Sequence, residues 1–220
     1  MDPQFWHERW ELNEIGFHQP QFNSLLTEYW PSLSSEERPG QVFVPLCGKS
    51  LDMVWLRKLG HSVIGVELSA VAITDFFQEQ SLPFSIETAD GLLRYEGDGL
   101  ELICGDFFDL EPRHLEKIQA VYDRAALIAL PRELQDRYAA HLDRLVPARA
   151  PILLLTLEYD LSEMQGPPFS TPEERVVELF GAGRRIEKLS ARDVLQDNPA
   201  LIGRGLTRLT ESAYMLSPMP

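Results

Sequence analysis

The sequence predicts an α/β fold of three layers, with helices on both faces of a doubly wound, mostly parallel sheet. Short apolar runs alternate with amphipathic helical stretches from residue 42 to about residue 179. The run at 152–157, Ile-Leu-Leu-Leu-Thr-Leu, is apolar almost throughout, which is typical of a central strand covered on both faces. The length of 220 residues suits one such domain, and the apolar fraction of 44% suffices for its core.

The first forty residues precede this alternation and are expected to form a helical extension. Trp6 and Trp10 are spaced four residues apart, so on a helix they share one face. A second helix is expected over 23–30, and the polar stretch 31–40, which holds two prolines, is expected to lead into the core. We therefore interpret the chain, 1–220, as a single domain with an N-terminal lid, 1–40, and a catalytic α/β core, 41–220.

The elements of the core follow from periodicity and from capping residues. Ser69 can cap one helix at its N-terminus, and Pro131 suits the first turn of a later one. Stretches with apolar residues every three or four positions are expected as helices, and short apolar runs as strands. We expect helices at 49–59, 70–80, 131–145 and 172–179, strands at 42–44, 62–66, 100–104, 120–122 and 152–157, a small hairpin at 84–88 and 92–96, and closing strands at 185–189 and 206–216.

Composition excludes several classes of partner. A formal net charge of −14 repels the phosphate backbone of DNA or RNA, so a small-molecule substrate is expected and a nucleic acid is not. No apolar run approaches about 20 residues, so no membrane span is expected, and residues 1–12 lack the pattern of a secretory signal. Cys47 and Cys104 are expected as buried free thiols in the cytoplasm, with a disulfide as the alternative. The five histidines show no metal-ligand spacing, so no metal is expected.

The most informative stretch joins the first two core strands. A single glycine, Gly48, separates the first strand from its helix, and Glu67 ends the second strand nineteen positions later. In dinucleotide-binding folds an acid near that spacing accepts hydrogen bonds from ribose hydroxyls. A P-loop would need a further glycine where Phe43 stands, and Pro45 lacks an N–H for a pyrophosphate. We therefore expect an adenosyl ligand without phosphates, S-adenosylmethionine; the alternatives are an ordinary turn and a solvated glutamate.

Two further strand ends carry candidate ligand contacts. Asp106 and Phe107 follow the strand at 100–104 and would hold adenine, the alternatives being a helix cap and a core position. Arg124 follows the strand at 120–122 and would hold the methionine carboxylate or a substrate anion, with Asp123 as its partner. A surface ion pair is the alternative for these two residues. Because ligands of such sheets lie at the carboxyl ends of the strands, all four are expected near one another.

These motifs resemble the thiopurine S-methyltransferases, specifically their bacterial branch. The resemblance covers nearly the whole chain. It implies the class I methyltransferase fold, which is Rossmann-like, and S-adenosylmethionine as the methyl donor. The stretches that carry it are Phe5-Trp6-His7-Glu8-Arg9-Trp10, Ile15-Gly16-Phe17-His18-Gln19, Phe43-Val44-Pro45-Leu46-Cys47-Gly48-Lys49, Gly60 to Glu67, Asp123-Arg124 and Gly166-Pro167-Pro168-Phe169.

The resemblance also implies an activity and a set of site residues. The activity is S-methylation of aromatic or heterocyclic thiols such as thiopurines, together with methylation of selenium or tellurium species and hence tellurite resistance, by a monomer. Phe17 matches the position at which the family packs an aromatic ring against the substrate. The donor contacts implied are Trp10, Leu46, Glu67 and Arg124, and Asp106 and Phe107 match the positions at which the family meets adenine; Gly48 completes the cofactor-binding set.

Methyl transfer from a sulfonium to sulfur is an in-line displacement that needs alignment and exclusion of water, not a covalent intermediate. Arg124 is therefore expected to favour the thiolate, with Asp123 beside it, and His18 is either a proton acceptor or a structural residue. We expect Trp10, Phe17 and the Gly166–Phe169 turn to form a lid. The alternative functions are a nicotinamide-dependent oxidoreductase and a non-catalytic protein that binds an adenosyl ligand.

Overall fold

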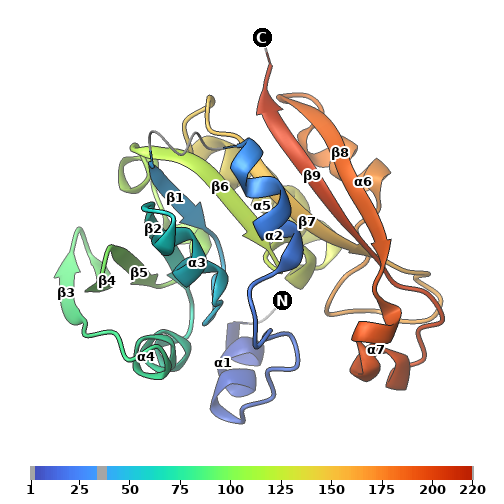
Figure 1. The fold of residues 1–220 in the computed structure, drawn as a ribbon, viewed down its shortest axis with the longest axis horizontal. Helices are drawn as coiled ribbons and strands as arrows, with labels where there is room; N and C mark the ends of the chain where they lie inside the picture. Colours follow the sequence, from blue (N-terminus) through green and yellow to red (C-terminus); the bar gives the residue numbers. More distant parts are fainter. Residues whose placement is uncertain (1–2, 34–38, 220) are drawn as a thin grey trace.

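A computed structural model describes residues 3–33 and 39–219, whose strands form a single sheet (Figure 1). The order of strands across the sheet is β3-β4-β5-β2-β1-β6-β7-β9-β8. The strands are β1 (Gln41–Val44), β2 (Ser62–Glu67), β3 (Ser85–Ala89), β4 (Leu92–Gly97), β5 (Leu100–Cys104), β6 (Ile118–Arg124), β7 (Ile152–Glu158), β8 (Arg184–Asp193) and β9 (Thr210–Pro218).

The five central strands are parallel, and antiparallel strands extend the sheet at both edges. β1 pairs in parallel with both β2 and β6, while β5 and β7 continue the parallel region outwards. After β1 the chain winds in one direction through β2 and later returns to β6 on the other side of β1. The carboxyl ends of β1 and β6 therefore meet at a topological switch point, where open α/β sheets bind their ligands.

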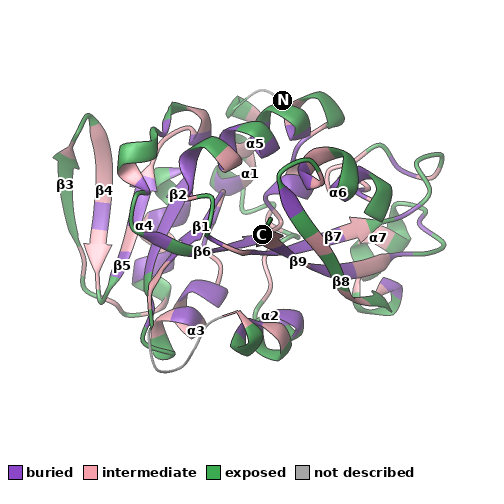
Figure 2. Ribbon diagram, turned by 90° about the horizontal axis from the view of Figure 1, so that it is seen from above, coloured by how far each residue is buried: buried purple, intermediate pink, exposed green. Residues whose placement is uncertain are grey.

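Helices cover both faces of the sheet. The helices are α1 (Pro3–Glu11), α2 (Ser24–Tyr29), α3 (Asp52–Lys58), α4 (Ala70–Glu79), α5 (Arg132–Leu145), α6 (Glu173–Phe180) and α7 (Pro199–Gly203). Figure 2 shows α2 and α3 on one side of the sheet and α5 and α6 on the opposite side. This arrangement is the three-layer α/β fold that the sequence predicts.

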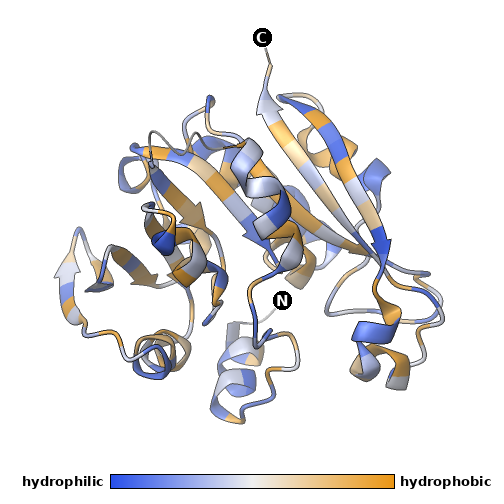
Figure 3. Cartoon of the chain, in the orientation of Figure 1, coloured by the Kyte–Doolittle hydropathy of each residue, from blue (hydrophilic) through white to orange (hydrophobic). Residues whose placement is uncertain are grey.

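Each face of the sheet has its own hydrophobic cluster. Val42 and Val44 pack with residues of α2, α3 and α4, whereas Phe43 between them packs with residues of α5 and α6. Side chains alternate along a strand, so a run of consecutive apolar residues supplies both clusters. In Figure 3 the central strands have mostly the colour of hydrophobic residues.

Most expected elements are confirmed, and two begin later than predicted for identifiable reasons. Ser69 caps α4 by accepting a hydrogen bond from Ala72 N, as predicted. The predicted helix at 49–59 begins only at Asp52, because Gly48 to Leu51 forms a turn in which Ser50 N bonds to Cys47 O. The predicted strand at 206–216 begins only at Thr210. Residues 206–209 instead form a loop after α7, which places Leu206 and Leu209 in a small separate apolar cluster.

The N-terminal extension also agrees in outline. Both predicted helices are present, as α1 and α2. The expected linker over 31–40 contains a 3₁₀ turn at Trp30–Ser32, and residues 34–38 lie outside the described residues. The predicted closing strand at 185–189 is longer, spanning β8 with an irregularity between Lys188 and Ser190.

Gly65 in the middle of β2 lets the glycine turn pack closely on the sheet. A Cβ atom at this position would lie 2.7 Å from Cys47 Sγ and 2.7 Å from Leu102 Cδ2. We expect Gly65→Ala to lower the free energy of unfolding by about 1–3 kcal/mol, measured by urea denaturation, because both contacts must be relieved. Gly203→Ala is the matched control, since nothing lies within 4 Å of a Cβ there. Equal stability of Gly65→Ala and the wild type would contradict this close packing.

Candidate functional site

Glu67 lies at the carboxyl end of β2, with its carboxylate hydrogen bonded to the backbone of two loops. Gly48 N donates to Oε2 at 2.9 Å, and Ser69 N donates to Oε1 at 2.8 Å. Burial raises the pKa of Glu67, and the N–H bonds from Ser69 and Gly48 oppose that rise. Each carboxylate oxygen keeps a second lone pair, so two hydroxyl donors could bind side by side. This donor–acceptor chemistry fits the adjacent hydroxyls of a ribose.

The loop after β1 adopts an unusual backbone beside this carboxylate. Leu46 has φ 45° and Gly48 has φ 51°, so both lie in the left-handed region, and Ala125 after β6 has φ 65°. For a residue with a side chain this conformation is strained, and such strain clusters at functional sites. The loop is held in place by Cys47 N, which donates to Val66 O at 2.9 Å. Two neighbouring strand ends at the switch point therefore carry strained residues.

An aromatic group from the N-terminal segment covers the glycine turn. A Cβ atom at Gly48 would lie 2.9 Å from Trp10 Cζ2, so only glycine admits the indole ring at this distance. Trp10 is buried, and its ring lies 5.4 Å from the ring of Phe17, which Trp6 also contacts at 5.7 Å. Figure 1 shows α1 beyond the carboxyl ends of the parallel strands. The shared face of Trp6 and Trp10 is confirmed, and their opening and closing as a lid stays a prediction.

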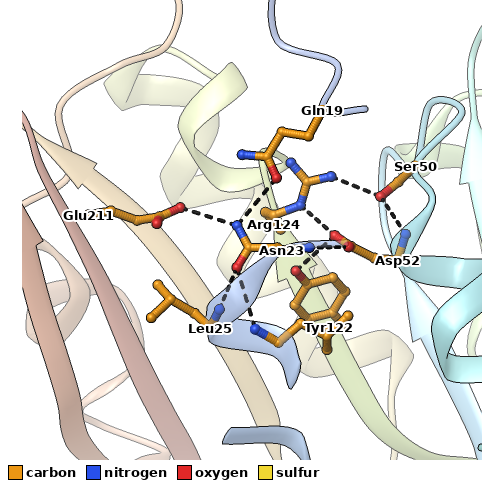
Figure 4. A network of polar contacts seen from close by, with 9 residues as sticks. Gln19, Asn23, Leu25, Ser50, Asp52, Tyr122, Arg124 and Glu211 are labelled. Atoms are coloured by element: carbon orange, nitrogen blue, oxygen red, sulfur yellow. Dashed lines mark hydrogen bonds and ion pairs between the residues drawn. The ribbon is translucent and has the colours of Figure 1, made fainter. Parts of the chain in front are cut away.

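Arg124 extends from the end of β6 into a polar network (Figure 4). Its Nε donates to Asp52 Oδ2 at 2.6 Å, and its Nη2 donates to Ser50 Oγ at 2.8 Å. The prediction that Asp123 pairs with Arg124 is wrong. The carboxylate that pairs with Arg124 belongs to Asp52, at the start of α3. Among the described residues Nη1 has no hydrogen-bond partner, so this nitrogen can bind an anionic ligand group.

Asp123 cannot pair with Arg124 because consecutive residues of a strand point to opposite faces of the sheet. Its carboxylate is fully buried and accepts hydrogen bonds from Tyr138 Oη at 2.7 Å and Leu127 N at 3.2 Å. Burial raises the pKa of Asp123 to about 6. These contacts fasten the turn after β6 to α5, which is a structural role.

Asp106 and Phe107 follow β5. In the structure Asp106 is a helix cap and Phe107 is a core residue, which are the alternatives that the sequence left open. Asp106 caps a 3₁₀ turn by accepting from Phe108 N at 2.9 Å. Phe107 is buried, with its ring 4.8 Å from that of Tyr138 and 6.4 Å from that of Phe43. The cap and the core position are therefore present, and the contacts with adenine stay predictions.

His18 lies within electrostatic range of Arg124 and Asp52, whereas the contacts of the Gly166–Phe169 turn are with other segments. Burial lowers the pKa of His18, as do the charges of Lys49 and Arg124, so its imidazole is held neutral. The turn is anchored by Phe169 N, which donates to Ile128 O at 2.6 Å, and by Arg204, which donates to Pro167 O at 2.7 Å. A proton-accepting role for His18, and a shared lid with the turn, both stay predictions.

The sequence as a whole matches one family of enzymes. The profile of the Thiopurine S-methyltransferase family matches residues 1–219. The chain belongs to this family. A Thiopurine S-methyltransferase of Methylococcus capsulatus is 56% identical over 217 residues, covering 98% of this chain and 97% of that relative. One from Pseudomonas fluorescens is 47% identical over 216 residues, covering 98% and 99%.

Solved structures confirm the methyltransferase fold. Magnesium protoporphyrin IX methyltransferase from Synechocystis, solved with bound S-adenosylhomocysteine, has a TM-score of 0.64 and 14% identity and covers 98% of this chain and 100% of its own. A 1,6-didemethyltoxoflavin-N1-methyltransferase from Burkholderia thailandensis has a TM-score of 0.62 and 14% identity, covering 98% and 87%. The predicted S-adenosylmethionine-dependent methyltransferase is thus confirmed, and an oxidoreductase is not favoured.

Cys47 and Cys104 are the two cysteines of this member of the thiopurine S-methyltransferase family. Both thiols are free, as predicted; Cys47 is buried, but Cys104 is only half-buried. Burial raises the pKa of both thiols, and the Glu67 carboxylate adds to the rise. Over the ranges 3–33 and 39–219, no helix has the length and apolar character needed to cross a bilayer.

The raised pKa of Asp123 gives a pH dependence of stability with a definite sign. Because the folded pKa of about 6 exceeds the ordinary value of 3.8, the stability contributed by this carboxyl is present below pH 3.8 and lost as pH rises through 6. Asp123→Asn cannot titrate. We expect the free energy of unfolding of the wild type, minus that of the variant, to fall by up to about 3 kcal/mol from pH 4 to pH 7 in urea denaturation.

Tyr138→Phe is the companion variant for this measurement. Loss of the Tyr138 hydroxyl removes a donor that stabilises the charged form of Asp123, which raises the folded pKa further, so the fall should begin at the same pH and continue to a higher one. A stability difference between wild type and Asp123→Asn that is flat or rises across this range would contradict the assignment.

Proposed function

We propose that this methyltransferase transfers a methyl group from S-adenosylmethionine to the sulfur of an aromatic or heterocyclic thiol such as a thiopurine. The observation that carries the proposal is the Glu67 carboxylate, buried at the end of β2 and held by the N–H groups of Gly48 and Ser69. Its remaining lone pairs match a ribose diol, and no pyrophosphate cradle surrounds the single glycine.

The residues around Glu67 suit the remaining parts of the donor. The turn through Leu46 and Gly48 would lie along the cofactor, with Trp10 covering it. Arg124 Nη1 would bind the methionine carboxylate, and Asp106 with Phe107 would lie at adenine. When bound, S-adenosylmethionine supplies an electrophilic methyl group on a sulfonium. The protein then has to place the acceptor in line with that methyl group and exclude water.

The N-terminal segment supplies a surface for an aromatic acceptor. The Phe17 side chain is 40% exposed, although its ring contacts Trp6 and Trp10. An exposed aromatic ring held at an angle by two others can pack against a flat heterocycle. Arg124 lies within electrostatic range of His18, and its positive charge would favour the thiolate form of an acceptor that reached this region.

The family resemblance extends the proposal to further properties. We include selenium and tellurium species among the acceptors, which would give tellurite resistance, and we propose a cytoplasmic monomer that binds neither membranes nor nucleic acid. Two free cysteines agree with a reducing compartment. We also propose that residues 1–40 act as the lid of a single domain whose catalytic core is 41–220.

The donor site is tested by Glu67→Gln. The amide cannot accept hydrogen bonds from both backbone N–H groups and both ribose hydroxyls, and it carries no charge. We expect the Kd for S-adenosylhomocysteine, measured by calorimetry, to rise about ten- to hundredfold. Glu87→Gln, on the exposed strand β3, is the control and should bind like the wild type. Equal affinity of Glu67→Gln and wild type would contradict the ribose assignment.

The acceptor site is tested in the same preparation by methyl transfer to an aromatic thiol, followed by mass spectrometry of the product. Phe17→Ala should raise KM for the thiol several-fold and change the Kd for S-adenosylhomocysteine much less, because the ring is expected to contact the acceptor directly and the donor site only through Trp10. Donor binding without methyl transfer to any aromatic thiol would contradict the proposed acceptor class and would favour a non-catalytic binding protein.

A further inference from the structure

Asp52 is a fully buried carboxylate at the start of α3 that receives three hydrogen bonds, two from β6 and one from the N-terminal segment (Figure 4). Arg124 Nε donates to Oδ2 at 2.6 Å, and Tyr122 Oη donates to the same oxygen at 2.9 Å. Asn23 N donates to Oδ1 at 2.8 Å. A buried carboxylate is costly unless it is paired, so this full set of donors fixes all three groups relative to one another.

The same network fixes the orientation of the Arg124 guanidinium. Ser50 Oγ accepts from Arg124 Nη2 and also from the backbone N of Asp52, at 2.8 Å and 3.3 Å. With Nε and Nη2 occupied, the plane of the guanidinium is set. Nη1, which has no partner among the described residues, is the part left for a ligand. The orientation of this ligand-binding nitrogen therefore depends on Asp52.

Asp52 also connects Arg124 to the N-terminal segment. Asn23, whose backbone N donates to Asp52, is the N-cap of α2 and accepts from Leu25 N at 2.9 Å. The Asn23 side-chain amide faces Gln19 Oε1 and Glu211 Oε1, each at 3.4 Å. Gln19 lies two residues after Phe17, so the chain that carries the aromatic group is anchored near the same carboxylate.

We propose that Asp52 is a positioning residue that holds Arg124 and the start of α2 in one arrangement, so that the donor's carboxylate and the N-terminal segment are placed together. The inference rests on the proposed function, in which Arg124 binds the methionine carboxylate. Asp52 does not touch the ligand. It acts through Arg124 on one side and through Asn23 on the other, and its charge offsets that of Arg124 within the buried network.

The test compares two ligands that share the adenosyl thioether but differ in the amino acid. S-Adenosylhomocysteine carries the amino-acid carboxylate, and 5′-methylthioadenosine lacks it. In Asp52→Asn we expect the Kd for S-adenosylhomocysteine to rise about ten- to hundredfold and that for 5′-methylthioadenosine to change less than about threefold, by calorimetry. A purely structural role would weaken both ligands equally, so equal losses would overturn the proposal, as would unchanged or tighter binding of S-adenosylhomocysteine.

Hydrogen exchange provides a second readout for the link to the N-terminal segment. In the wild type, S-adenosylhomocysteine should slow amide exchange in peptides covering residues 12–30; in Asp52→Asn this slowing should be lost. Asp143→Asn is the matched control, because it removes a carboxylate from another buried arginine, Arg184, which also bonds to Ala150 O before β7. The control should behave like the wild type in both measurements, and slowing retained in Asp52→Asn would overturn the link.

Tyr122→Phe keeps the inference testable where Asp52→Asn does not fold. It removes one donor to Asp52 and leaves the ring and both charges in place. The same selective loss for S-adenosylhomocysteine is expected, at about threefold, and equal effects on the two ligands would overturn the proposal. Failure of the wild type itself to bind S-adenosylhomocysteine would instead contradict the proposed function, so the two failures are distinguishable.

Discussion

The arrangement of the whole site depends on one buried carboxylate that joins two loops of the sheet. Glu67 accepts one backbone N–H from the loop after β1 and another from the loop after β2. Without these two bonds, a carboxylate with 7% exposure would be held at a large cost in free energy. Because Gly65 has no side chain, the loop after β1 can pack closely against β2. Because Gly48 has none, the ring of Trp10 can pack against that loop. The ligand-binding geometry is therefore built by the backbone, with one acid as its centre.

Two kinds of buried charged group lie at the carboxyl edge of the sheet. Arg124 is paired with an opposite charge and can bind a ligand, whereas Asp123 is surrounded by neutral donors and has a structural role. Arg124 and Asp52 neutralise each other, and Nη1 of Arg124 has no partner in the part of the chain that the structure describes. Asp123, on the other face of the same strand, is fully buried against neutral donors from Tyr138 and Leu127 and has a raised pKa, so no ligand can reach it. Alternation along β6 thus places a ligand-binding cation and a structural acid in adjacent positions.

Local sequence patterns sufficed for the fold and for the acid at its centre. Alternating apolar runs predicted the parallel strands, and the spacing from Gly48 to Glu67 predicted a carboxylate at the second strand end. The partner of Arg124 could not be predicted in this way, because Asp52 lies 72 positions earlier and only the folded sheet brings the two together. Sequence adjacency suggested Asp123 instead, although strand alternation argues against neighbours sharing a face.

The segment before β9 and the roles of Asn23 and Tyr122 show the same limit. Leu206 and Leu209 were consistent with a strand, but they pack into a local cluster with Tyr159 and Met164, which come from a distant part of the sequence. Asn23 caps α2, as a residue of its type can be expected to do, whereas its bond to Asp52 requires the N-terminal segment to lie beside the start of α3. The periodicity of helices and strands can be recognised in the sequence, whereas side-chain contacts between distant segments are determined by how the folded chain packs.

The central claim, that a ribose lies on the Glu67 carboxylate, is tested most directly by changing the ligand and leaving the protein intact. The measurement is the affinity of the wild-type chain for S-adenosylhomocysteine and for its 2′,3′-dideoxy analogue. We expect the analogue to bind at least about tenfold more weakly, since a charged acceptor loses two hydroxyl donors. Equal affinities for the two ligands would contradict it.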